Sequence, residues 1–297
     1  MPVTQTAELS ASNSSQTRIE VSPLSPNVGA RIVGADLTRP LPDAVFQDIV
    51  SAFHRYGILL FRGQTLACED VIRFSARFGR LETYSLRPEI QVKGYPELVN
   101  IANISDENGK PIGLAESGRL WHSDLQFKAE PAIASALYCV ECTAGDTEFS
   151  GMVAAYDALP EMTKRRIDGL KGVHSYLAYN AKYGNATRAM TDEQKKLVPN
   201  VAHPIARVHP ATGRKALYVS EGMTIGIEGM QDDEAQGLLA ELFAHSTQPE
   251  FVYRHVYQVG DLILWDNRAT MHRAMPFDGR HRRHMRRSTI MEQFPEI

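Results

Sequence analysis

Apolar residues in the first third of the chain recur with two different periods. Between residues 41 and 53 they fall three and four positions apart, which predicts an amphipathic helix that ends at Gly57. The uninterrupted apolar run 58–61 predicts a buried strand, and residues 17–37 predict two short strands around a turn. A second amphipathic helix is predicted through residues 71–78. The early chain therefore mixes helices with short strands.

Later in the chain, short apolar runs alternate with turn residues. Residues 133–140 predict a strand, residues 205–219 two strands around a turn, and residues 238–243 mark a late helix. The periodicity weakens over residues 80–118, although residues 98–104 predict another strand, and residues 172–204 are polar and broken by Gly and Pro. We expect irregular loops in both stretches, the first of them a lid or binding loop. The order of elements predicts an all-β barrel decorated by helices.

Composition narrows the class of protein and of partner. A chain of 297 residues with 43% hydrophobic content can bury a substantial core, so we expect one domain over residues 18–297. Residues 1–17 are rich in Ser, Thr, Gln and Ala, which predicts a mobile tail on a cytoplasmic protein. The net charge of -3 favours neither nucleic acid nor a membrane surface as a partner. We expect small-molecule partners and a homo-oligomer.

The most suggestive chemical pattern is His122-x-Asp124, in residues 121–127, which the sequence presents as an extended segment. Side chains two apart on a strand project to the same face, so both could bind one ion. The best third ligand is His272, which follows the apolar run 262–265 and a turn. Two histidines and one carboxylate form the facial triad that holds non-haem Fe(II), and they also suit catalytic zinc. The triad alone leaves the metal open.

A cluster of arginines near the end of the chain bears on that choice. If residues 282–291 form the last strand, Arg283 and Arg287 share one face with Met285. Pointing inward, the two guanidinium groups would need anionic partners, because buried charges are costly without them. A 2-oxo acid cosubstrate and an anionic substrate would supply these partners, which favours an iron oxygenase over a zinc hydrolase. The alternative is a surface strand whose arginines pair with acidic residues.

Other residues with chemical potential have simpler explanations. We expect His209 and His255 to make structural hydrogen bonds and Trp265 to pack in the core. The chain has three cysteines, and Cys139-x-x-Cys142 is not completed by a second cysteine pair, so these cysteines are interpreted as ordinary packing residues.

Several of these motifs together resemble the Fe(II)/2-oxoglutarate dioxygenases of the TauD/TfdA family. The resemblance rests on His122-x-Asp124, Thr147 in a Gly-Asp-Thr turn, the run Trp-Asp-Asn-Arg before His272, and Arg283 eleven residues after His272. It spans nearly the whole chain from about residue 20. The family fold is a double-stranded β-helix, or jelly roll, which agrees with the strand-rich second half.

The resemblance implies a role for each matching position. His122, Asp124 and His272 would bind Fe(II), Thr147 and Arg283 would hold 2-oxoglutarate, and O2 would be the second cosubstrate. The residues implied or suggested for an anionic organic substrate are Arg287, Arg87, Lys110 and Tyr84.

Within the family, the sequence most resembles members that oxidise aryloxyacetates. This implies a substrate such as 2,4-dichlorophenoxyacetate, whose ether would be cleaved to a phenol and glyoxylate. Oxidation of taurine, another alkylsulfonate or another small carboxylate is the alternative within the family. Outside it, a zinc hydrolase would act without O2, and a non-catalytic metal-binding jelly roll would release no succinate.

Overall fold

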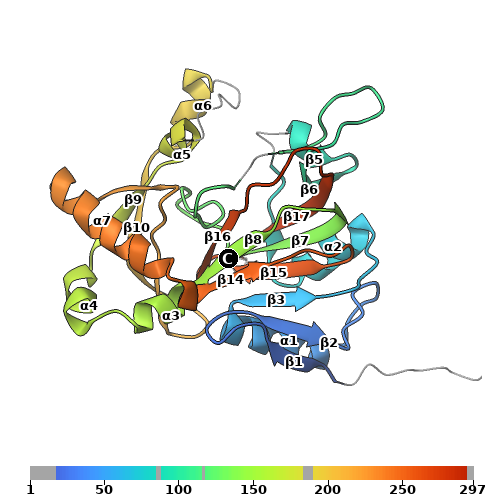
Figure 1. Cartoon of the computed structure of the whole chain (residues 1–297), viewed down its shortest axis with the longest axis horizontal. Coiled ribbons are helices and arrows are strands. Elements are labelled where there is room, and N and C mark those ends of the chain that lie inside the picture. Colours follow the sequence, from blue (N-terminus) through green and yellow to red (C-terminus); the bar gives the residue numbers. More distant parts are fainter. Residues whose placement is uncertain (1–17, 85–87, 116–117, 183–189, 293–297) are drawn as a thin grey trace, which may run out of the picture.

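The computed structural model describes residues 18–84, 88–115, 118–182 and 190–292, and the structural statements below refer to these residues. A large mixed sheet lies at the centre, with helices on either side (Figure 1). Its strands, in spatial order, are β1 (Glu20–Pro23), β2 (Ala30–Val33), β3 (Ile58–Phe61), β15 (Leu262–Asp266), β7 (Ala134–Cys142), β17 (Arg283–Met291), β6 (Tyr95–Ala102) and β5 (Gln91–Val92), while β4 (Arg80–Leu81) also pairs with β17.

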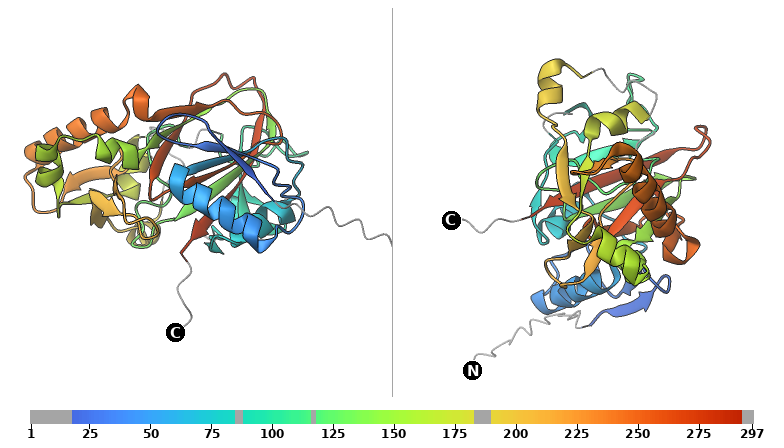
Figure 2. Two further views of the ribbon diagram at one scale, coloured as in Figure 1. Left: turned by 90° about the horizontal axis from the view of Figure 1, so that it is seen from below. Right: turned by 90° about the vertical axis from the view of Figure 1, so that its left-hand side faces the viewer.

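Two N-terminal helices, α1 (Asp43–Tyr56) and α2 (Cys68–Ala76), contribute to a core that they share with the large sheet. The predicted stop of α1 is confirmed, because Gly57 adopts the left-handed conformation with φ 70° and its N–H bonds the carbonyl of Phe53. Figure 2 shows α1 on the outside of the sheet. This face of the sheet is therefore structural, and the opposite face remains for other contacts.

A smaller antiparallel sheet contributes to the core on this opposite face of the large sheet. Its strands are β14 (Val252–His255), β8 (Thr147–Gly151) and β16 (Thr270–Ala274). Phe149 of β8 packs against Trp265 of β15, with ring centroids 5.6 Å apart, inside a cluster drawn from both sheets. The expected packing role of Trp265 is confirmed. The two sheets thus enclose a common interior, into which β16 and β17 direct side chains.

The remaining elements form an outer lobe, which Figures 1 and 2 place at the end of the molecule away from α2. They are α3 (Met152–Asp157), α4 (Glu161–Ile167), α5 (Tyr176–Lys182), α6 (Asp192–Lys196), α7 (Asp232–Ser246), the sheet β10 (Val201–Pro204), β9 (Lys171–His174) and β13 (Thr224–Ile227), and the hairpin β11 (Ala206–Val208) and β12 (Lys215–Leu217). Many of them surround a second core, whereas α5 packs in a smaller cluster with Phe127. The hairpin confirms the turn predicted within residues 205–219. The loop expected over 172–204 is wrong in part, because α5, α6, β10 and most of β9 lie there, and β9 is ordered by pairing with β10 and β13.

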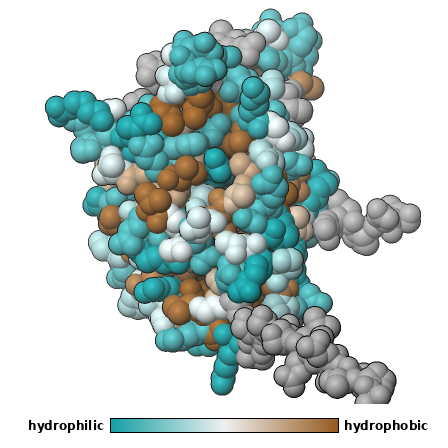
Figure 3. Space-filling model, turned by 90° about the vertical axis from the view of Figure 1, so that its right-hand side faces the viewer, coloured by the Kyte–Doolittle hydropathy of each residue, from teal (hydrophilic) through white to brown (hydrophobic). Residues whose placement is uncertain are grey.

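The mainly β interpretation with accompanying helices is confirmed. The predicted tail, residues 1–17, lies outside the described residues, as does Arg87. On the face shown in Figure 3, hydrophobic residues lie in several groups separated by hydrophilic ones. None of the described helices is both long and apolar enough to cross a membrane. The homo-oligomer stays a prediction.

Candidate active site

The two candidate histidine ligands are joined to each other through their backbones. The N–H of His122 donates to the carbonyl of His272 at 3.0 Å, and the N–H of His272 donates back at 2.8 Å. His272 lies in β16, whereas His122 makes only this single bridge. Such a pair places two side chains close together even though the residues are far apart in sequence.

The extended segment expected over residues 121–127 is wrong beyond that bridge. The chain enters a turn at Asp124, and Leu125 adopts a positive φ of 54°. The side chain of Asn267, in the turn between β15 and β16, accepts a hydrogen bond from the N–H of Asp124 at 3.0 Å. A side chain remote in sequence therefore fixes the backbone that orients the carboxylate, and local alternation does not.

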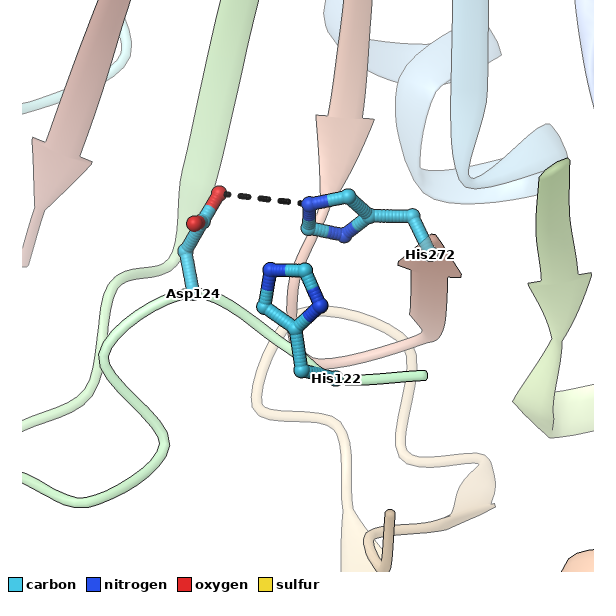
Figure 4. Close-up of side chains that lie close together, drawn as sticks. All are labelled: His122, Asp124 and His272. Carbon is cyan, nitrogen blue, oxygen red and sulfur yellow. Dashed lines mark ion pairs between the residues drawn. The ribbon is translucent and has the colours of Figure 1, made fainter. Parts of the chain in front are cut away.

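Despite this difference in backbone, the three predicted ligands converge. His122, Asp124 and His272 are buried, and their ligand atoms lie within 4.8 Å of one another (Figure 4). The Nδ1 of His122 donates to the carbonyl of Leu120 at 2.7 Å, which leaves Nε2 with a free lone pair. The Oδ2 of Asp124 accepts from Ser135 at 2.7 Å and lies 3.9 Å from the Nε2 of His272. This donor set fits one divalent ion with open positions.

Electrostatics keep the ligands in the protonation states that metal binding requires. Burial lowers the pKa of both His122 and His272, so both are neutral at pH 7. Burial would raise the pKa of Asp124, but nearby Arg287 and the two histidines outweigh it and lower that pKa to about 2. Neutral imidazoles and an ionised carboxylate are the metal-binding forms.

Arg287 lies directly beside the triad. Its Nη1 donates to Asp124 Oδ1 at 2.9 Å, and its Nη2 donates to the hydroxyl of Tyr84 at 3.0 Å. The Tyr84 hydroxyl also bonds Thr289 at 2.7 Å, and Tyr84 adopts a positive φ of 44°. A bulky residue rarely adopts this conformation, so the surrounding contacts must hold it. Arg287 and Tyr84 are thus within the site, as the sequence predicted for both.

Arg283 occupies a separate buried position on the same face of β17. Its guanidinium carbon lies 5.9 Å from the ring of Tyr257, whose hydroxyl donates to Thr147 Oγ1 at 3.2 Å. The turn before β8 packs tightly on the arginine, because a Cβ on Gly145 would lie 2.9 Å from Arg283 Cδ. Gly145 also has φ 95°, so this turn requires glycine twice over. The buried Nε of Arg283 has no hydrogen-bond partner among the described residues.

Not every sequence candidate lies at the site. Lys110 is exposed in a surface turn that its backbone closes with Asp106, so it is outside the buried cluster. Sequence reasoning missed Ser135, Asn267 and Tyr257 as supporting residues. Asn267 was at least part of the Trp-Asp-Asn-Arg motif, whereas no local signal marks a buried serine or tyrosine.

The structural roles expected for the other histidines are confirmed. His209 donates from Nε2 to Asp266 at 2.9 Å, and His255 donates from Nε2 to Asp261 at 3.1 Å. Both pairs are buried. Neither histidine contributes to the triad.

Two facing sheets with an open site of two histidines and one carboxylate define the metal-dependent oxygenase class of jelly-roll proteins. A family profile described as "Taurine catabolism dioxygenase TauD, TfdA family" matches residues 20–289. The chain belongs to this family, which confirms the resemblance and the jelly-roll core. It is an alpha-ketoglutarate-dependent dioxygenase, so 2-oxoglutarate and O2 are its cosubstrates.

Individual relatives cover almost the entire chain. The alpha-ketoglutarate-dependent 2,4-dichlorophenoxyacetate dioxygenase of Cupriavidus pinatubonensis is 34% identical over 284 residues, covering 92% of this chain and 98% of that protein. An (S)-phenoxypropionate/alpha-ketoglutarate-dioxygenase of Sphingobium herbicidovorans is 32% identical over 283 residues, covering 91% and 94%. The crystal structure of AAD-2 in complex with Mn(II) and N-oxalylglycine superposes with a TM-score of 0.79 at 34% identity, covering 94% of this chain and all of that one.

Proposed function

We propose that this dioxygenase binds Fe(II) through His122, Asp124 and His272 and oxidises an aryloxyacetate. The support for the ion is the converging donor set, with His122 fixed through Leu120 and Asp124 fixed through Ser135. Bound Fe(II) would supply activation of O2, which no side chain can perform alone. The protein's own contribution is to hold and orient the two organic reactants.

The observation that carries the proposal is the pair of inward-facing arginines on β17. Arg283 is 4% exposed and lies near the Tyr257–Thr147 hydrogen bond, where a carboxylate could accept from the guanidinium and the Thr147 hydroxyl. We assign this position to the distal carboxylate of 2-oxoglutarate. Two separate interior cations, buried Arg283 and partly buried Arg287, suit a reaction that brings two organic acids together.

Arg287 and Tyr84 would then meet the carboxylate of the primary substrate. Burial alone would lower the pKa of Arg287, but Asp124 and Tyr84 outweigh it and raise that pKa above its ordinary value, so the guanidinium remains charged. A substrate anion would compete with Asp124 for the Nη1 donor of Arg287 and with the Tyr84 hydroxyl for its Nη2 donor. Anchored there, an aryloxyacetate would present the carbon beside its ether oxygen to the metal. Hydroxylation at that carbon gives a hemiacetal that separates into a phenol and glyoxylate, while 2-oxoglutarate and O2 yield succinate and CO2.

The substrate class rests on the similarity to an aryloxyacetate and an aryloxypropionate dioxygenase over more than nine-tenths of the chain. A second candidate is taurine or another alkylsulfonate, because the matching family profile is described by taurine catabolism. A sulfonate could accept the same fork of hydrogen bonds from Arg287.

Steady-state succinate release tests the assignments. With 2,4-dichlorophenoxyacetate as substrate, Arg283→Ala should raise the KM for 2-oxoglutarate roughly ten- to hundredfold, whereas Arg287→Ala should raise the KM for the herbicide by a similar factor. Arg282→Ala is the matched control, because the Arg282 side chain is exposed and pairs with Glu141. Equal effects of both variants on both KM values would refute the division of roles.

A panel of aryloxyacetates, aryloxypropionates and alkylsulfonates then identifies the substrate. We expect the highest kcat/KM with an aryloxyacetate. A higher value with taurine would replace this substrate by the sulfonate alternative.

A further inference from the structure

A bulge in β7 brings the two cysteines of the Cys-x-x-Cys sequence to one face. In a regular strand, residues three apart face opposite sides. Here Cys142 lies opposite Arg283 and Cys139 lies opposite Met285, which leaves Val140 as the extra residue. Arg283 and Met285 are two apart on β17 and share a face, so both thiols point to the interior between the sheets.

The two thiols are in contact but have different surroundings. Cys139 is fully buried in the cluster between the sheets, whereas Cys142 packs on the edge of the same cluster and is half-buried. A hydrogen bond from Cys139 lowers the pKa of Cys142 to about 7, against the effect of burial and with help from nearby Arg283. The same bond raises the pKa of Cys139. Cys142 is therefore the reactive member of the pair.

The pair adjoins the turn that packs on Arg283. The Cys142 thiol donates to the carbonyl of Ala144 at 3.1 Å, and the next residue, Gly145, lies against the Arg283 side chain. Cys142 is also the direct cross-strand partner of Arg283. Anything bound to the guanidinium of Arg283 therefore lies close to the reactive thiol.

We propose that Cys139 and Cys142 form a redox-modification site, which a low-molecular-weight disulfide converts reversibly into an intramolecular disulfide. The Cys142 thiolate attacks one sulfur of the reagent, which breaks the reagent's S–S bond and releases one thiolate. The Cys139 thiol then loses its proton and attacks Cys142 Sγ, releasing the second thiolate. The protein dithiol is oxidised, and one disulfide is reduced to two thiols.

A second statement rests on the proposed function of Arg283. If the distal carboxylate of 2-oxoglutarate lies on that guanidinium, bound cosubstrate both shields Cys142 and neutralises the charge that favours its thiolate. Cosubstrate therefore slows the oxidation.

The experiment incubates the full chain in glutathione disulfide buffers and analyses it by intact mass and tryptic mapping. Cys139 and Cys142 fall within one tryptic peptide, residues 129–164. We expect this peptide to lose the mass of two hydrogen atoms and to regain it with dithiothreitol. Cys68 is an internal control, because it begins α2, is buried in the separate core that α1 and α2 share with the large sheet, and should remain a thiol.

Two variants make the result decisive. Cys142→Ser should prevent the mass loss, and Cys139→Ala should stop the reaction at a stable glutathione adduct on Cys142. The half-buried position of Cys142 makes its serine variant the safer one for folding. Wild-type protein that stays reduced, or that accumulates only the mixed disulfide, overturns the proposal.

Cosubstrate protection is measured as the oxidation rate under anaerobic conditions with Fe(II). Saturating 2-oxoglutarate should slow oxidation roughly tenfold, the effect of covering and protonating the thiolate, whereas pyruvate, which lacks a distal carboxylate, should not. A separate binding titration shows whether 2-oxoglutarate binds at all. Failure to bind refutes the proposed function and leaves the disulfide result intact. Binding without protection refutes the second statement, that 2-oxoglutarate held by Arg283 shields Cys142.

Discussion

Two buried carboxylates, Asp124 and Asp266, each have histidine and arginine neighbours, but they differ in how many of the surrounding polar atoms are hydrogen-bonded. Asp266 accepts from His209 at 2.9 Å and from the Arg268 side chain at 2.8 and 2.7 Å, and it also accepts from the Arg268 N–H. Every buried side-chain polar atom of these three residues has a hydrogen-bond partner. Around Asp124, by contrast, two buried nitrogen atoms, His272 Nδ1 and Arg287 Nε, have no hydrogen-bond partner among the described residues.

This difference separates a structural cluster from a reactive one. A buried polar network stabilises the fold only when its members are satisfied. The closed Asp266 cluster joins the β11–β12 hairpin to the turn between β15 and β16. The open cluster retains unfilled hydrogen-bonding capacity and a histidine pair whose lone pairs remain available. Residue types alone do not distinguish the two, and the geometry does.

Removing one histidine from each cluster gives the largest contrast. His272→Ala should reduce succinate release more than about a hundredfold, because it removes a proposed metal ligand, while the thermal midpoint of the metal-free protein stays close to that of wild type. His209→Ala should retain metal but lose about 1–3 kcal/mol of unfolding free energy, because Asp266 loses a buried donor. Metal analysis and thermal denaturation measure both effects. Metal retained by His272→Ala would contradict the assignment.

Neutralising the structural carboxylate should also be costly. Asp266→Asn should lower the unfolding free energy by about 3–5 kcal/mol, because Arg268 is left buried without its counter-charge. The control is Asp157→Asn, whose partner Arg214 and own side chain are both more than half exposed, so that change should cost less than about 1 kcal/mol. Urea denaturation of both variants measures these differences. Similar midpoints for the two variants would show that the closed cluster does not stabilise the fold.

Acid should weaken the closed cluster with a definite sign. Burial would raise the pKa of Asp266, but Arg268 and His209 outweigh it and hold that pKa below its ordinary 3.8. A lowered folded-state pKa gives stability that is present above the unfolded-state pKa and is lost as the pH falls through the folded-state value. Thermal midpoints should therefore begin to fall below about pH 5 and continue to fall as the pH drops further. The decline should be shallower in Asp266→Asn, and an unchanged slope would count against this cause.

The smallest expected effect concerns Thr147. Thr147→Val keeps the shape of the side chain but removes the hydroxyl that accepts from Tyr257. We expect the KM for 2-oxoglutarate to rise about fivefold, the loss of roughly one hydrogen bond, with kcat little changed. Thr143→Val, at an exposed position in the preceding turn, is the control for this measurement. A change in kcat alone would place Thr147 outside the cosubstrate pocket.

Sequence patterns predicted what local physics determines. The apolar run of β3 and the left-handed Gly57 after α1 were both found where expected, because burial and a helix C-cap have short-range signals. The strand position of Arg283 and Arg287 followed from alternation alone. The side-chain types also led to three residues that converge in the structure, since few residue types can hold a metal.

The failures arose where distant contacts decide the conformation. The turn at Asp124 depends on Asn267, and the order of β9 and β10 depends on their pairing, which local sequence does not reveal. The same limit applies to the cysteines, which were interpreted as packing residues. Their common face comes from a bulge defined by the partner strand β17.

The reciprocal backbone bonds between His122 and His272 have a consequence for folding. Because the two histidines lie in distant parts of the sequence, they can share one ion only after β16 has packed beside His122. A divalent ion that needs both ligands would therefore bind late in folding and stabilise the packed arrangement over the unfolded chain.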